Sequence, residues 1–401
     1  MIRNISHTWG ILGICLLAFI AIAVTTDQIF EHVPHSEDEV AYLFQAKVFA
    51  QNRLTAPTPP HRHAFWSPFV VDYQGHRFGK YPIGWPLLLN LGVRLGHPWL
   101  INAVLGCLTL ALLGWLGRYL YTPKMGIGAA ALGLLTPGFL FQSSSLLSHT
   151  ASLFWVTIAL VALASLAPNS PATLMRNSRS QHLLSAIIGA ALGATFITRP
   201  FAAFGIGLAV GSFFMILVIR AEIKVSALLT FLVAGSAVAA MLPLYWWTIT
   251  GDPSFNPYLL IWPYDRVGFG PDIGPYGYDL TTALLINTRL KLETVATGLF
   301  GWPGWSNLLF LPIPFITGKA KRWDWFLLSL ISSMVFIHIF YWAFGGADGG
   351  FPRYYYDAFP AFILLTVRGI FIVAEYLKQW QIVKLGVNAS WGLSFLLVLF
   401  I

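Results

Sequence analysis

The chain of 401 residues is 57% hydrophobic and only 10% charged, and its mean hydropathy is +0.68. Soluble domains have roughly 45–50% apolar and about 25% charged residues, so this composition excludes a soluble enzyme and indicates an integral membrane protein. The net charge of +8 comes from basic residues scattered through short loops. That distribution is typical of membrane proteins and implies no nucleic-acid partner.

Apolar runs long enough to cross about 30 Å of hydrocarbon recur along the whole sequence. The first run ends in TTDQIF without a small-residue cleavage pattern, so we interpret it as an uncleaved helix. No polar tract is long enough to form a separate soluble domain, which predicts a single all-α polytopic membrane domain over residues 1–401. About eleven spans are predicted, near residues 9–26, 98–120, 124–142, 148–167, 183–198, 201–219, 225–248, 303–317, 325–344, 358–377 and 388–401.

The charges of the loops predict the orientation of these spans. If the N-terminus is cytoplasmic, every loop on the cytoplasmic side is short and basic, as the positive-inside rule requires. The same orientation places two long loops, 27–97 and 250–302, outside. Long loops in a compact protein are usually functional or disordered, and these two are too aromatic for disorder. We therefore expect the chemistry on the extracytoplasmic face.

The stretch HSEDEVAYLFQAK, residues 35–47, directly follows the first span. The spacing of its apolar residues predicts a short amphipathic helix that lies on the membrane surface. Three carboxylates, Glu37, Asp38 and Glu39, stand at the start of this helix. Because the helix dipole favours carboxylates there, two interpretations are open: the cluster caps the helix, or it performs chemistry.

Further along the chain, four more stretches stand in a recognisable order: GKYPIGWPLL, DRVGFGPDIG, NTRLKLETVATGLFGWPGW and FPRYYYDAFPAFILL. Together with the Asp-Glu pair and its surface helix, they resemble the GT-C superfamily of membrane glycosyltransferases. The resemblance is to the bacterial branch related to protein O-mannosyltransferases and the lipid A aminoarabinose transferase. It implies a GT-C fold with amphipathic and re-entrant helices in the first external loop. It also implies a sugar donor carried on a polyprenyl phosphate.

Direct transfer from a lipid phosphate to a hydroxyl inverts the anomeric carbon and needs one general base. The family's Asp-Glu motif implies that Asp38 is this base, with Glu39 as the alternative. Its neighbour Glu39 is then expected to orient the acceptor or a nearby cation, because adjacent side chains on a helix do not share a face. The anionic leaving group needs fixed positive charge. Lys80, in FGKYPIGWP, resembles the family's loop lysine that meets the lipid phosphate.

Two arginines are further candidates for the phosphate. Arg353, in GGFPRYYY, suits a bidentate phosphate contact, although an arginine at a membrane boundary also serves as a headgroup anchor. Arg199, in FITRPFAAF, lies between two apolar spans with almost no loop. A charge in such a place usually points into a polar cavity, so Arg199 is a second phosphate contact or one half of a structural ion pair. Tyr81, beside Lys80, is an accessory candidate.

Candidates for the acceptor side come from two turns. His149, in FQSSSLLSHTAS, stands where some relatives have an acidic residue, and it is either an acceptor or metal contact or part of the structure. The aromatic loop 250–302 is the expected acceptor-side lid, with Asp265 and Arg266 as contacts. Histidines at 61, 63 and 76 lack the spacing of a zinc site, so no metal or other cofactor is expected.

The sequence thus predicts an inverting glycosyltransferase with an extracytoplasmic site in the plasma membrane, which is the inner membrane of a bacterium. Its expected partners are a polyprenyl-phosphate-linked sugar, a glycan, lipid or protein acceptor, and membrane lipids. Two alternatives stay open: a transporter or flippase of lipid-linked sugars, and a non-catalytic binder of them. A transporter would favour inverted repeats and helices broken near the bilayer midplane, and no convincing internal repeat is found. No motif encodes the sugar or the acceptor.

Overall fold

The computed structural model describes residues 2–167, 178–345 and 353–379. Seven helices in these ranges are long and apolar enough to cross a membrane. They are α1 (Ile2–Gln28), α4 (Leu100–Leu120), α7 (His149–Leu166), α8 (Ser178–Thr198), α9 (Pro200–Ile219), α10 (Val225–Ala239) continued by α11 (Met241–Thr250), and α15 (Phe359–Gln379) with the turn before it. The predicted helical membrane architecture is confirmed, whereas the predicted number of eleven spans is not.

An eighth span is present if a bent pair of helices is counted as one. The pair comprises α5 (Pro123–Leu135) and α6 (Pro137–Ser144), which replace the single helix predicted at 124–142 and meet at an angle of 65°. At the junction Thr136 has an extended backbone, with ψ of 114°. Pro137 causes this bend, because proline disfavours helical backbone in the residue before it.

Three other predicted spans have different outcomes. The segment 303–317 is not a span: it contains a 3₁₀ turn, Gly304–Leu308, and the four-residue helix α13 (Ile313–Ile316). Prolines at 303, 312 and 314 divide it, although its hydropathy suggests a helix. The segment 325–344 is α14 (Arg322–His338), which has 17 residues. The span predicted at 388–401 lies outside the described residues.

The first long loop, 27–97, is built around a small sheet that the sequence did not predict. After the expected amphipathic helix α2 (Glu37–Ala50) come β1 (Ala56–Pro57), β2 (Val70–Tyr73) and β3 (His76–Gly79), which pair antiparallel in the order β1-β3-β2. The helix α3 (Gly84–Arg94) follows and leads into α4. In the second long loop, 250–302, a π-helical segment at Thr282–Thr288 runs into α12 (Arg289–Gly298).

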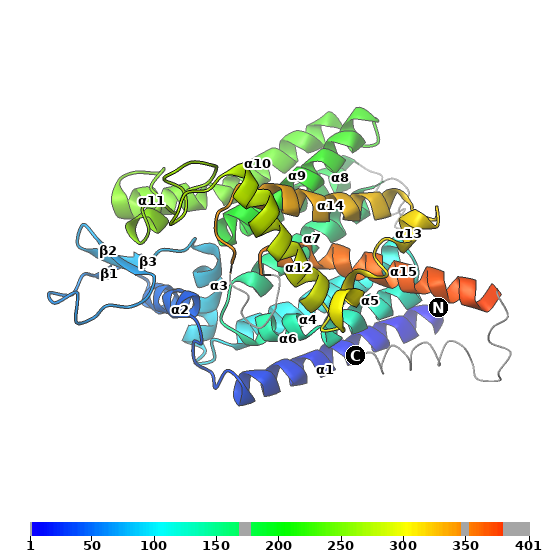
Figure 1. Ribbon diagram of the computed structural model, residues 1–401, viewed down its shortest axis with the longest axis horizontal. Helices are drawn as coiled ribbons and strands as arrows, with labels where there is room; N and C mark the ends of the chain where they lie inside the picture. The colour runs from blue at the N-terminus through cyan, green and yellow to red at the C-terminus, as the bar shows by residue number, and fades with distance from the viewer. Residues whose placement is uncertain (1, 168–177, 346–352, 380–401) are drawn as a thin grey trace.

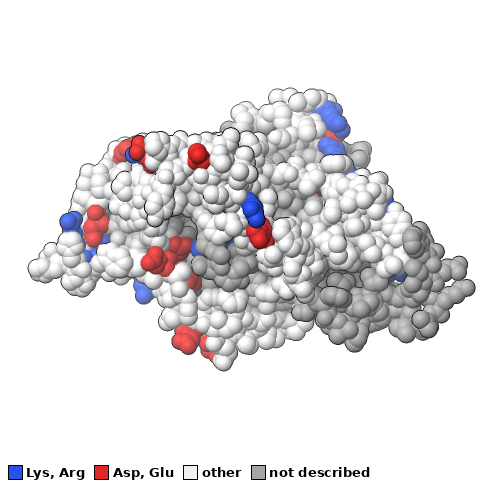
Figure 2. Space-filling view, in the orientation of Figure 1, with Lys and Arg blue, Asp and Glu red and all other residues white. Residues whose placement is uncertain are grey.

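The two long loops lie at the same end of the helix bundle. In Figure 1, α2, the sheet and α11 gather at one end, and the chain start of α1 lies at the other. Ring contacts join the two loops: Phe69 to Trp262 at 5.3 Å and Tyr73 to Phe255 at 4.9 Å between ring centroids. On the face seen in Figure 2, most acidic side chains lie toward this end, beside a broad uncharged area. The structure therefore brings the two loops together, as the predicted topology requires.

The helices of the bundle approach one another closely where they carry small residues. A Cβ atom added at Gly189 of α8 would lie 2.1 Å from the carbonyl oxygen of Phe231 on α10. One added at Gly193 would lie 2.6 Å from the carbonyl oxygen of Gly235. Glycines spaced four residues apart allow such approach, which replaces the hydrophobic effect as the source of helix association within lipid.

Candidate active site

At the start of α2, the two adjacent carboxylates of the Asp-Glu motif point toward different partners. Glu39 is buried and completes a capping box with Ser36: its Oε2 accepts from the backbone N–H of His35 at 2.8 Å and of Ser36 at 2.9 Å. Its Oε1 accepts from the backbone N–H of Leu146 at 2.6 Å. The capping interpretation is therefore correct for Glu39. Protein donors occupy both of its oxygens, so it fixes α2 to the turn between α6 and α7 instead of meeting a cation.

Asp38 points to a different set of partners. Its Oδ2 accepts from Nη2 of Arg353 at 2.6 Å, and its Oδ1 accepts from the hydroxyl of Tyr81. Arg353 stands just before α15, more than 300 residues away in sequence. The ring of Tyr81 also packs on Tyr42, with 4.5 Å between centroids. We call Asp38, Arg353, Tyr81 and Lys80 the Asp38 cluster.

Lys80 lies in the same cluster, enclosed by aromatic rings. Its Nζ is 3.6 Å from the ring centroid of Phe69, 4.2 Å from that of Trp262, 5.0 Å from that of Tyr258 and 5.2 Å from that of Tyr81. The side chain is buried, and among the described residues it forms no ion pair. Aromatic faces stabilise an ammonium ion without neutralising it. Lys80 therefore keeps its charge available for a ligand.

Burial affects the titration of this lysine and of Asp265, which lies nearby. Loss of hydration lowers the pKa of Lys80 to about 8, although the carboxylates of Asp265, Asp38 and Glu37 oppose this effect. Burial likewise raises the pKa of Asp265. The Oδ1 of Asp265 accepts from Nε1 of Trp342 at 3.0 Å. Asp265 is thus a buried carboxyl group beside the cluster.

The other predicted site residues are not part of the Asp38 cluster. Arg266, next to Asp265, is exposed, and its guanidinium forms no hydrogen bond or ion pair with a described residue. Arg199 pairs with Asp357, with 3.5 Å between Nε and Oδ2, and Asp357 is fully buried. This geometry matches the ion-pair alternative for Arg199. His149 is buried at the start of α7, where its ring meets Tyr356 edge to face at 6.2 Å.

Sequence reasoning missed several groups that form this site. Phe69, Tyr258 and Trp262 surround Lys80, and Asp357 neutralises Arg199. The aromatic richness of the loops was visible, but no local spacing distinguishes these three rings from residues of an interfacial belt. Within the described ranges, no three His, Cys, Asp or Glu side chains come together in a way that could hold a metal ion.

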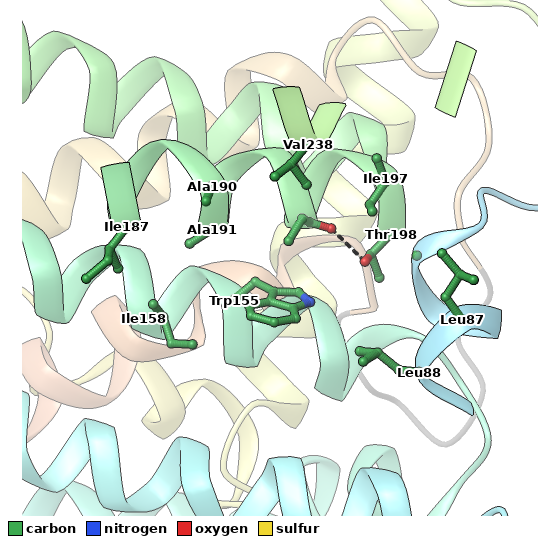
Figure 3. A pocket seen from close by; sticks show the side chains of 12 residues that line it. Leu87, Leu88, Trp155, Ile158, Ile187, Ala190, Ala191, Ile197, Thr198 and Val238 are labelled. Atoms are coloured by element: carbon green, nitrogen blue, oxygen red, sulfur yellow. Dashed lines mark hydrogen bonds between the residues drawn. The ribbon is translucent and has the colours of Figure 1, made fainter. Parts of the chain in front are cut away.

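An apolar cavity of about 510 Å³ lies between α3, α7, α8 and α10. Figure 3 shows side chains from these helices converging on it, among them Leu88, Trp155 and Ile187. Thr198, which also lines the cavity, donates its hydroxyl to the carbonyl of Ala194 at 2.7 Å, so its polar group is already satisfied. Gly84, four residues after Lys80, lines it as well. The cavity therefore suits an apolar occupant.

Comparisons with protein-family models and with curated proteins give no match. Solved structures do match. ArnT from Cupriavidus metallidurans bound to undecaprenyl phosphate has a TM-score of 0.60 and 14% identity, over 94% of this chain and 66% of that chain. The Archaeoglobus fulgidus oligosaccharyltransferase in the apo form has a TM-score of 0.56 and 15% identity, over 97% and 54%. This chain thus spans about two thirds of the first protein and about half of the second.

Both neighbours are GT-C glycosyltransferases, and a third match is the oligosaccharyltransferase AglB from Archaeoglobus fulgidus in complex with an inhibitory peptide and a dolichol-phosphate, with a TM-score of 0.52 and 14% identity. At such identities the likeness concerns the fold. It agrees with the helical membrane architecture of this chain. The chain therefore has the GT-C fold, as its sequence predicts.

Proposed function

We propose that this protein is an inverting glycosyltransferase that moves a sugar from a polyprenyl phosphate to a hydroxyl group of a lipid, glycan or protein acceptor. The observation that supports this most strongly is the Asp38 cluster. It combines a carboxylate fixed by Arg353 and Tyr81 with an ammonium group that has no carboxylate partner among the described residues. A base beside a fixed cation is what transfer from an anionic lipid carrier requires.

In the proposed reaction, the acceptor hydroxyl gives its proton to Asp38 while its oxygen forms a bond to the anomeric carbon. The bond between that carbon and the phosphate oxygen breaks, and its electron pair leaves with the polyprenyl phosphate. Attack and departure take place on opposite faces, so the anomeric configuration inverts. Lys80 and Arg353 stabilise the leaving phosphate. A guanidinium has five N–H donors, so Arg353 can bind the phosphate and Asp38 at the same time.

We assign the polyprenyl tail to the apolar cavity between α3, α7, α8 and α10. The cavity and Lys80 are joined by a short piece of chain, since Gly84 lines the cavity and Lys80 carries the phosphate-binding ammonium. An isoprenoid chain is apolar, and the side chains around the cavity offer it apolar contacts. The structure of ArnT bound to undecaprenyl phosphate is consistent with this class of donor.

We assign the acceptor to the second long loop. Tyr258 and Trp262 present aromatic rings beside the phosphate site, and sugar rings stack on such surfaces. Asp265 and the exposed Arg266 follow on the same loop and are proposed as acceptor contacts. His149, which is buried beside Tyr356, is proposed as an accessory residue of the acceptor site. We place this end of the molecule outside the plasma membrane and the N-terminus in the cytoplasm.

The test is a transfer assay on purified protein with radiolabelled polyprenyl-phosphate sugars. We expect Asp38→Asn to lower the release of polyprenyl phosphate by about 10²- to 10⁴-fold while donor binding survives. Glu37→Gln is the matched control, because it removes the same charge from an exposed neighbouring residue. Equal losses in the two variants would contradict the role of Asp38. A wild-type protein that transfers no sugar but moves the lipid between leaflets would favour the transporter alternative.

A further inference from the structure

The helical segment 282–298 of the second long loop carries a lysine on its inward face. The buried residues of this segment are Ala283, Asn287, Thr288, Lys291, Val295 and Ala296. Successive members of this set are one, three or four residues apart, which places them on one stripe that faces the interior. Lys291 is the charged residue of this stripe, and its side chain is only 5% exposed.

The ammonium group of Lys291 has no hydrogen-bond partner in the part of the chain that the structure describes. Its described contact is the ring of Tyr354, with 5.1 Å from Nζ to the ring centroid. Three residues earlier, and therefore next to it on the same helix face, the hydroxyl of Thr288 also has no hydrogen-bond partner within the described ranges. Two neighbouring polar groups are thus buried and unsatisfied, which is costly unless a ligand binds them.

The position of Lys291 connects it to the Asp38 cluster. Tyr354, whose ring Lys291 contacts, directly follows Arg353. The ring of His338 stacks on that of Tyr354, with 5.4 Å between ring centroids. The two arginines of this region already have carboxylate partners, Asp38 and Asp357. No acidic side chain of the described residues forms an ion pair with Lys291, so Lys291, like Lys80, is a buried cation without a carboxylate partner in this part of the chain.

The backbone before Lys291 is also unusual. Residues Thr282–Thr288 form a π-helix, whose hydrogen bonds span five residues instead of four. Such wide turns are rare and occur frequently at functional sites, because they change which residues face inward. Asn287 is held in this turn by a hydrogen bond from its side-chain amide to the carbonyl of Trp342. The wide turn therefore sets the rotation of the helix that directs Thr288 and Lys291 inward.

We propose that Lys291, with Thr288, binds a second anionic group of a substrate, in addition to the phosphate assigned to Lys80. This inference rests on the proposed function. The group is a phosphate or a comparable oxyanion, because an ammonium and a hydroxyl both donate to such oxygens. It belongs to the donor, as the second phosphate of a diphosphate-linked sugar, or to the acceptor, as an anionic substituent.

Binding to the purified full-length protein distinguishes these two sources, with three probes: undecaprenyl phosphate, undecaprenyl diphosphate, and inorganic phosphate added to protein saturated with undecaprenyl phosphate. If the donor supplies the second group, Lys291→Met weakens binding of the diphosphate at least tenfold and leaves the monophosphate unchanged. If the acceptor supplies it, Lys291→Met abolishes binding of inorganic phosphate and leaves both lipids unchanged. Arg289→Met is the control, because it removes a charge from the exposed face of the same helix.

Thr288→Val provides a second variant of nearly unchanged volume and is expected to cause a smaller loss with the same probe. Equal affinities of wild type, Lys291→Met and Thr288→Val for all three probes would overturn the inference and leave the proposed function intact. A loss of the monophosphate that matches the loss of the diphosphate would overturn it as well, because Lys291 would then belong to the first phosphate site. Wild-type protein that binds none of the probes would contradict both proposals.

Discussion

Asp38 and Glu39 contact different partners because they are successive residues of one α-helix. Successive side chains on an α-helix point about 100° apart. Glu39 therefore reaches back to the cap and to the backbone of Leu146, while Asp38 reaches Arg353 and Tyr81. Each capping hydrogen bond contributes about 1 kcal/mol, so Glu39 also stabilises the helix that presents Asp38. Glu39 thus stabilises the position of Asp38, the proposed base.

We expect Lys80 to make the binding of polyprenyl phosphate, the leaving group of the proposed reaction, dependent on pH. Its pKa of about 8 means that the ammonium loses its proton as the pH rises above 8, whereas a phosphate monoester, with a second pKa of about 6, stays dianionic there. The attraction between the two groups is then lost. We expect the affinity of the wild type for undecaprenyl phosphate to fall as the pH rises from 8 to 10, by up to about tenfold per unit.

The matched variant is Lys80→Arg, whose guanidinium stays charged throughout this range. We expect it to bind undecaprenyl phosphate more weakly at pH 7, because a larger group must fit among the rings of Phe69 and Trp262, but with an affinity that no longer falls above pH 8. Titrations at several pH values measure both effects. If the arginine variant shows the same decline as the wild type, the titrating group is not Lys80.

The resemblance of short motifs to the GT-C superfamily selected Asp38, Lys80, Tyr81 and Arg353, which the structure brings together. Each stands in a short distinctive stretch, so no long-range information was needed to find it. The residues that complete the site are different. Trp262 and Lys291 lie in stretches that read equally well as an interfacial belt or an exposed helix, and only tertiary packing turns them inward.

At the scale of elements, the packing of α8 on α10 depends on glycine. Alanine is normally more stable than glycine in a helix by about 1 kcal/mol. In Gly189→Ala, however, the new methyl group would lie 2.1 Å from the carbonyl oxygen of Phe231, so the two helices must separate. Overpacking of this kind costs about 1–3 kcal/mol. We therefore expect a lower melting temperature for this variant in detergent.

Gly211→Ala on α9 is the matched control, since an added Cβ there meets no atom within 4 Å. We expect its melting temperature to be unchanged or higher. Thermal unfolding of the two purified variants, followed by tryptophan fluorescence, compares them directly. If Gly189→Ala is as stable as Gly211→Ala, close packing of α8 on α10 does not limit the stability of the bundle.

Hydropathy located most long helices but not the interruptions between them. The runs at 98–120 and 201–219 became α4 and α9 almost unchanged, because a continuous apolar segment has few alternatives in lipid. The strands β1–β3 were missed because they contain only two to four residues each, too few for an alternating pattern to be visible. The span predicted at 303–317 was wrong for a different reason. The segment is apolar enough, but its prolines divide it.

At the scale of the whole molecule, the bundle has two chemically different ends. One end carries the two long loops and the Asp38 cluster, and the other carries short loops such as 220–224 between α9 and α10. Basic residues of those short loops include Arg220, Lys224 and Arg322, of which Arg322 pairs with Glu222 at 3.0 Å. On the positive-inside rule we propose that this second end faces the cytoplasm.

Single cysteines test this orientation. We expect a cysteine at Gln74, in the exposed β2–β3 turn, to react with a membrane-impermeant maleimide on intact cells, and a cysteine at Lys224 to react only after permeabilisation. Both are introduced after Cys15 and Cys107, which are half-buried, have been replaced by alanine. The opposite pattern would place the Asp38 cluster on the cytoplasmic side. In that case cytoplasmic nucleotide-linked sugars would become candidate donors, and a polyprenyl carrier exposed only on the outer leaflet could not reach Lys80.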